Sequence, residues 1–111
     1  MNYNEMRFNT DIAQVCGLRE AVIACFLRDL QAKSTETTYR YGYFWVKCTQ
    51  KMMTVHMPFL TEDMVSNSVK KLADKGIIKV AVLSNDKFDH TYWYTFTDYG
   101  EELLDDRRCF A

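Results

Sequence analysis

The order of secondary-structure signals between residues 43 and 100 limits the possible folds more than any other feature of this chain. An aromatic, strand-like run is followed by two segments with helical spacing and a tight turn between them, and then by two β-rich runs joined by a polar tip. These segments are 43–46, 49–57, 61–75, 77–83 and 91–97, with the turn at 57–60 and the tip at 84–89. This order is that of a winged helix-turn-helix, an α+β fold in which helices pack on a small antiparallel β-hairpin sheet. Such a fold places one helix where it can enter a DNA groove.

The length and composition of the chain set further limits. Its 111 residues suffice for one domain with a real core and leave little room for a second. Hydrophobic residues make up 48%, which is not typical of a disordered chain. No apolar run approaches the roughly 20 residues needed to cross a bilayer, and the N-terminus lacks the basic start and apolar stretch of a signal peptide. We therefore expect a single cytoplasmic domain spanning 1–111, with its core at about 8–104, a short C-terminal tail and no membrane contact.

The cysteines and histidines form no recognisable metal, redox or catalytic motif. No Cys-x-x-Cys pair and no nearby histidine pair accompanies the four cysteines, which are Cys16, Cys25, Cys48 and Cys109. In a reducing compartment such residues are free thiols, buried or half-buried. Neither His56 nor His90 lies beside a serine or cysteine in a known nucleophile motif, and the chain has no glycine-rich phosphate loop. The sequence thus predicts a protein that is not an enzyme and needs no metal or cofactor.

The charge balance is unusual for a DNA-binding domain, which normally carries a basic surplus. Fourteen basic and fifteen acidic residues give a net charge of −1. Residues 98–111 hold five of the acids and two of the bases, so the rest of the chain carries a net charge of +2. This weak surplus does not favour tight, non-specific binding to DNA.

The remaining segments are predicted from their periodicity and from helix-breaking residues. Residues 9–11 include N-cap candidates for a short first helical turn, which Gly17 ends. A longer helix is predicted over 18–33, because its apolar residues recur with a 3.6-residue period and form a broad stripe. The polar, threonine-rich segment 34–40 is predicted to be an exposed loop, and a last short helix is predicted over about 98–105.

The helix predicted over 61–75 has the clearest division into an inner and an outer face. Thr61 is a suitable N-cap, and Lys75 followed by Gly76 marks the C-terminal end. Three apolar residues share one face and are predicted to pack into the core: Val65, Val69 and Leu72. Polar and charged residues occupy the opposite, outward face: Asp63, Ser66, Asn67, Lys70 and Asp74.

Several stretches of the chain together resemble a known family. They are IAQVCGLREA at 12–21, GYFWV at 42–46, PFLT at 58–61, VKKLADKGII at 69–78 and HTYWYTFT at 90–97. Over roughly residues 8 to 104 the chain is similar to the winged-helix N-terminal domain of phage and mobile-element replication proteins, the replisome-organiser or DnaD-like group. The aromatic strand before the helix pair and the Thr-Tyr-Trp-Tyr strand after the wing are the most specific parts. The resemblance implies binding of double-stranded DNA through the second helix of the pair, with further contacts from the wing tip.

The residues expected to contact DNA lie in three places. On the outward face of the second helix, Asn67 is suited to a bidentate contact with adenine and Ser66 to contacts with several bases. Lys70 would meet a base edge or a phosphate, while the start of the first helix and the wing tip would contact phosphates. The complete predicted set is Thr49, Gln50, Lys51, Thr61, Ser66, Asn67, Lys70, Lys71 and Lys87. The alternative is that these residues are ordinary solvated side chains. Asp63 and Asp86 favour this alternative, because their carboxylates would repel phosphates.

Aromatic residues are concentrated in and around the predicted strands, and they have two possible uses. They pack the sheet against the helices, which is the commoner use, or they stack on unpaired bases. The residues concerned are Tyr39, Tyr41, Tyr43, Trp45, Tyr92, Trp93 and Tyr94.

The expected function is therefore binding of double-stranded DNA, by a small transcriptional regulator or an accessory replication factor of a phage or mobile element. A homodimer is expected from the long apolar helix over 18–33, because such domains often read paired half-sites. The alternative is a protein-binding winged helix, a phage-type inhibitor or adaptor, whose near-neutral, aromatic-rich surface docks a partner protein.

Overall fold

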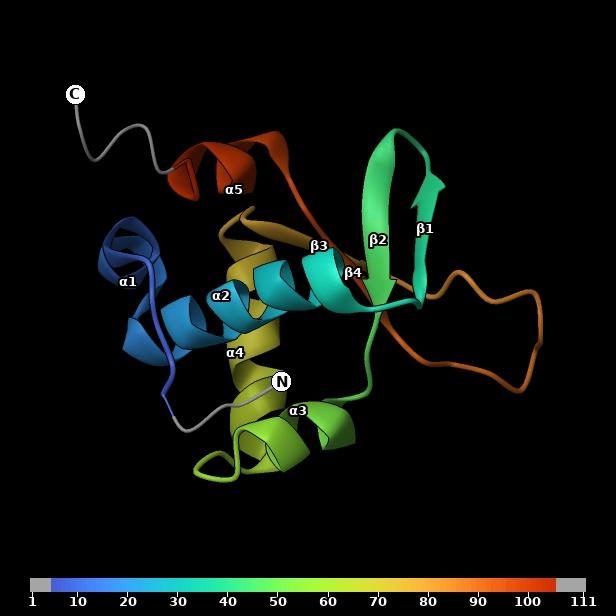
Figure 1. Cartoon of the computed structure of the whole chain (residues 1–111), viewed down its shortest axis with the longest axis horizontal. Coiled ribbons are helices and arrows are strands. Elements are labelled where there is room, and N and C mark those ends of the chain that lie inside the picture. Colours follow the sequence, from blue (N-terminus) through green and yellow to red (C-terminus); the bar gives the residue numbers. More distant parts are fainter. Residues whose placement is uncertain (1–4, 106–111) are drawn as a thin grey trace.

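The structure is a computed structural model, and residues 5–105 of it are described here. Within this range the chain forms five helices and four strands, arranged as Figure 1 shows. The elements are α1 (Thr10–Cys16), α2 (Leu18–Lys33), β1 (Thr37–Arg40), β2 (Tyr43–Lys47), α3 (Gln50–His56), α4 (Glu62–Asp74), β3 (Ile78–Ala81), β4 (Trp93–Phe96) and α5 (Asp98–Leu103). Among the described residues, no helix is both long enough and apolar enough to cross a membrane.

The strands form one antiparallel sheet in the order β1-β2-β4-β3. β3 and β4 are the wing hairpin, and β2 joins it through the pairing of Val46 with Tyr94. The helices gather on one side of the molecule and the β1–β2 hairpin stands beyond them, while the wing loop extends farther out on the same side (Figure 1). The fold is therefore α+β with the winged helix-turn-helix arrangement expected from the order of elements.

The core lies between the helices and the inner face of the sheet. α2 contacts both α4 and β2, and its Ile23, Phe26 and Leu27 are buried. The sheet contributes Val46 and Tyr94, which are also buried. The buried residues of the α2 stripe thus pack inside their own chain, and the expected homodimer stays a prediction.

The structure corrects the prediction for residues 34–40. Residues 37–40 are not a loop but β1, which pairs along its whole length with β2. The connection is a two-residue turn in which Tyr41 and Gly42 have φ angles of 57° and 81°. Both values are positive, as a type I′ hairpin turn requires, and glycine adopts this conformation without strain.

The other elements differ from the prediction mainly at their ends. β3 and β4 are shorter than the predicted runs 77–83 and 91–97, so the wing loop extends over 82–92. α5 ends at Leu103, two residues before the predicted end. The helix-turn-helix pair, by contrast, lies where the sequence placed it.

The described cysteines are buried, as expected, and none of them is in a disulfide: Cys16, Cys25 and Cys48. Burial raises the pKa of Cys16 and raises the pKa of Cys48 to about 12, so neither is a reactive thiolate near neutral pH. The prediction for Cys109 lies outside the described residues.

The aromatic residues of the strands differ in how far they are buried. Trp45 and Tyr94 are buried in the sheet, as expected for core packing. Tyr39 and Tyr41 are 78% and 76% exposed, and Tyr92 is 45% exposed, so these three do not serve the core.

Candidate nucleic-acid interface

The turn between α3 and α4 is held by its own apolar residues and by a helix cap. Met57 and Leu60 are buried, and the Leu60 N–H donates to the Met57 carbonyl at 2.9 Å. Thr61 then caps α4, since its Oγ accepts a hydrogen bond from the backbone N–H of Met64 at 3.2 Å. These contacts fix the direction in which α4 leaves the turn.

The far end of α4 is closed by a glycine. Gly76 has a φ of 75°, a left-handed conformation that ends helices. The Ile77 N–H then donates back to the Leu72 carbonyl at 3.0 Å. The cap and this C-terminal turn fix the two ends of α4. The two faces of the helix between them have different environments.

The inner and outer faces of α4 agree with the prediction. Val65, Val69 and Leu72 are buried in the core, as expected. The residues predicted to face outward are all exposed: Asp63, Ser66, Asn67, Lys70 and Asp74. The polar face of α4 is therefore open to solvent within the chain.

A buried carboxylate joins α4 to α2. Glu20 is 4% exposed, and its carboxylate accepts a hydrogen bond from the hydroxyl of Ser68, which is also buried. Arg19 Nε donates to Ser68 Oγ at 2.6 Å, and Lys71 Nζ lies 3.8 Å from Glu20 Oε1. The predicted DNA contact Lys71 is thus already paired with an acid of its own chain.

The pKa of Glu20 is lowered by these contacts despite the burial of the carboxyl. Burial opposes ionisation of the carboxyl, but the Ser68 hydrogen bond, a backbone hydrogen bond and the charges of Lys71 and Arg19 outweigh it, so the pKa lies below its ordinary value. Glu20 is therefore ionised at neutral pH and holds its cationic and hydroxyl partners around it.

The start of α3 brings three predicted contact residues into one notch. Thr49 caps the helix by accepting from the Met52 N–H at 2.9 Å, and Gln50 and Lys51 follow it. The notch has a volume of about 260 Å³, and the wing contributes to it; the lining residues are Cys48, Thr49, Gln50, Lys51, Glu62, His90, Thr91 and Tyr92. The sequence did not indicate that the base of the wing would complete this notch.

The wing loop is shaped by short polar turns. The Asp86 carboxylate accepts from the Phe88 N–H at 2.9 Å, and Lys47 Nζ pairs with Asp89 at 3.1 Å. The hydrogen bonds from Thr91 and Lys47 hold the pKa of Asp89 well below its usual range. These contacts tie the base of the wing to β2.

Lys87, the predicted wing contact, is exposed at the tip of this loop, and its ammonium lies 5.3 Å from the centroid of the Phe88 ring. The wing loop extends away from α4 in Figure 1, so the structure does not bring Lys87 together with the α4 group. The predicted residues therefore form separate groups: the outward face of α4, the notch at α3 and the wing tip.

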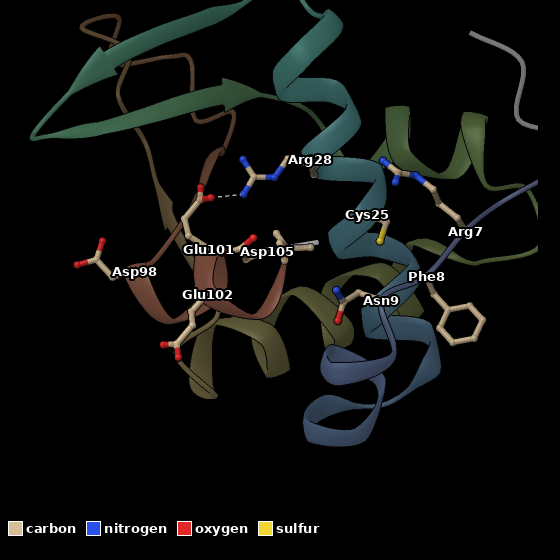
Figure 2. Close-up of a pocket in the computed structure, with 10 residues that line it drawn as sticks. Arg7, Phe8, Asn9, Cys25, Arg28, Asp98, Glu101, Glu102 and Asp105 are labelled. Atoms are coloured by element: carbon tan, nitrogen blue, oxygen red, sulfur yellow. Dashed lines mark hydrogen bonds and ion pairs between the residues drawn. The ribbon is translucent and has the colours of Figure 1, made fainter. Parts of the chain in front are cut away.

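A second hollow, on another part of the surface, is acidic. It has a volume of about 820 Å³, and its lining includes Asp98, Glu101, Glu102, Arg7 and Arg28. Figure 2 shows Glu101 of α5 turned toward Arg28 of α2, with which it forms an ion pair. Among residues 5–105 no group of histidine, cysteine, aspartate and glutamate side chains is arranged to hold a metal ion. The hollow is a poor match for phosphates, because acids outnumber bases around it.

The network around Glu20 is the part of the site that sequence reasoning missed. The spacing of Ser68 could have predicted its burial, because Ser68 follows Val65 by three residues and precedes Leu72 by four. Residues at these spacings share a face of a helix, so Ser68 had to point toward the core. A buried hydroxyl requires a hydrogen-bond partner, and Glu20 supplies it.

Replacing Thr61 by alanine is expected to lower the free energy of unfolding by about 1 kcal/mol, because α4 loses its N-cap. Thermal and urea unfolding followed by circular dichroism measure this change. Thr61→Ser keeps the hydroxyl and is the matched control, which should stay within about 0.5 kcal/mol of the wild type. An alanine variant as stable as the serine variant would contradict the role of this cap.

Comparison of the chain with protein families, with curated proteins and with solved structures finds no match.

Proposed function

We propose that this protein binds double-stranded DNA through α4, as a small transcriptional regulator or an accessory replication factor of a phage or mobile element. The assignment to such an element rests on the resemblance to the winged-helix domain of replisome-organiser and DnaD-like proteins. The DNA-binding proposal also has independent support from the geometry of α4.

The observation that carries the proposal is the uncovered polar face of α4. Ser66, Asn67 and Lys70 are exposed, while the opposite face is buried and both helix ends are fixed. A rigid helix with an open polar face suits the major groove, where Asn67 can pair with the edge of adenine. Lys70, one helical turn away, can then contact a phosphate or a base.

The charges around this face favour a modest number of phosphate contacts. Lys51, Lys70 and Lys87 are exposed, but Glu62 and Asp63 lie at the N-terminal end of α4. Acids at this end repel phosphates, so non-specific attraction is weak. Sequence-specific contacts must then supply a large share of the binding free energy.

The salt dependence of binding tests the proposal. Duplexes are first selected from a random pool, and affinity is then measured by fluorescence anisotropy between about 50 and 200 mM salt. Two to four phosphate contacts predict that log K falls against log salt with a slope of about −2 to −4. An empty selection, or binding that does not weaken with salt, would overturn the proposal.

A specific observation favours the second candidate, a protein-binding winged helix. Met52 and Val55 are three residues apart on α3 and share a face, and they are 47% and 65% exposed. Phe59 in the following turn is 59% exposed. This apolar surface is a candidate site for a partner protein. Replacing Met52, Val55 or Phe59 by a charged residue should leave the affinity for DNA unchanged if α4 alone reads the groove.

A further inference from the structure

β1 is an outer strand of the sheet, and its free side has no partner among the described residues. The strand order puts β1 at one edge and β3 at the other. The β1–β2 hairpin stands away from the helices, with β1 on its outer side (Figure 1). The unpaired side of β1 is therefore open to a further strand.

The register of the hairpin determines which backbone groups point to this open side. The Lys47 N–H donates to the Glu36 carbonyl at 3.0 Å, so Glu36 faces β2. Backbone groups alternate along a strand, so Thr38 also faces β2, whereas the N–H and C=O groups of Thr37 and Tyr39 point outward. These outward groups can form hydrogen bonds with another strand.

This edge has two of the features that normally limit pairing, because β1 is only four residues long and ends at the charged Arg40. It lacks others, namely lysine, proline and a bulge. β1 has the sequence Thr-Thr-Tyr-Arg, whose β-branched and aromatic residues favour strands, and it pairs regularly with β2 without a bulge. Tyr39 is 78% exposed beside this edge.

We propose that β1 pairs with β1 of a second copy of the chain, antiparallel and centred on Thr38. In this register Thr37 lies opposite the partner's Tyr39, and each donates one backbone hydrogen bond to the other. A twofold axis through Thr38 repeats the pair on the other side. The two four-stranded sheets then form one continuous sheet.

Charge complementarity identifies the second copy as the occupant. In the register centred on Thr38, Arg40 lies opposite the partner's Glu36, and the twofold axis gives the same pair at the other end. Glu36 and Arg40 are both exposed; Arg40 Nη1 donates to the Leu83 carbonyl of the wing loop at 2.9 Å, which leaves the other guanidinium N–H groups for the partner's Glu36. Opposite charges that face each other across strands are stabilising, whereas a parallel arrangement would set like charges against each other.

A charge-swap experiment on the full chain tests this pairing. Sedimentation equilibrium from about 1 μM to about 1 mM measures the dimer Kd. Glu36→Arg and Arg40→Glu should each weaken the dimer about tenfold or more, because attractive cross-strand pairs become repulsive. Mixing the two variants should restore association as a heterodimer, in which both facing pairs again have opposite charges.

Several outcomes would overturn the proposal. They are a wild type that stays monomeric across the whole concentration range, a mixture of the two variants that fails to associate, and equal weakening by Glu5→Arg, an exposed control with the same charge change. Circular dichroism of each variant establishes that it is folded. The dimer does not require that DNA be the ligand, so loss of DNA binding alone would leave this result unaffected.

Discussion

The double variant Asn67→Ala/Lys70→Ala is expected to bind its selected duplex about a hundredfold more weakly than the wild type. A bidentate contact from an asparagine to adenine contributes about 1–3 kcal/mol of discrimination, and a lysine contact to the DNA backbone adds to it. Both residues are exposed and lie opposite the core face of α4, so the melting temperature should not fall. Fluorescence anisotropy and thermal unfolding measure the two effects separately.

The single variants separate the two contacts. Asn67→Ala should relax the preference for one base pair, whereas Lys70→Ala should weaken binding to all duplexes and reduce the salt slope by about 1. Lys33→Ala is the matched control, since Lys33 is an exposed lysine at the C-terminal end of α2. If both single variants keep the affinity of the wild type, α4 is not the helix that reads DNA.

The helix-turn-helix was predictable because its signals are local. Thr61, the apolar spacing of Val65, Val69 and Leu72, and the stop at Gly76 each act within a few residues. Such signals reflect the geometry of one helix and need no knowledge of distant parts of the chain. The exposure of Asn67 followed from the same geometry.

β1 could not be predicted in this way, because its formation depends on pairing. Residues 37–40 are polar and half-exposed or exposed, so no alternation of apolar residues marks them as a strand. The indications of a hairpin were the threonines and tyrosine of this segment, the turn at Tyr41 and Gly42, and the aromatic strand after it. A strand on the edge gains its stability from the partner strand, which the local pattern does not show.

The position of the wing loop relative to α4 could not be predicted for the same reason. The polar residues 84–89 were correctly expected between two strands, but the direction in which the loop leaves the sheet depends on contacts such as Lys47 with Asp89. These residues are 42 positions apart in the sequence. Such pairings determine how far Lys87 lies from α4, and no local signal contains them.

Replacing Glu20 by alanine is expected to lower the free energy of unfolding by about 2–4 kcal/mol. The variant loses the link between α2 and α4 and leaves the buried Ser68 hydroxyl without its carboxylate acceptor. Arg19 and Lys71 are partly exposed and can turn to water, so the loss should not exceed this range. Glu20→Gln retains the shape and a hydrogen-bond acceptor, so its loss should be smaller. Urea unfolding at pH 7 measures both.

The pH dependence distinguishes the charge of Glu20 from its packing. The folded-state pKa of Glu20 lies below its ordinary value of 4.5, so the carboxylate stabilises the protein fully above that pH and loses this contribution as the pH falls through the folded-state pKa. Protonated glutamate resembles glutamine in this site. The stability difference between the wild type and Glu20→Gln should therefore shrink in acid. Glu62→Gln, at an exposed position on α4, removes the same charge and is the control for the effect of net charge. A difference that stays constant from neutral pH into acid would mean that Glu20 acts through shape alone, with no role for its charge.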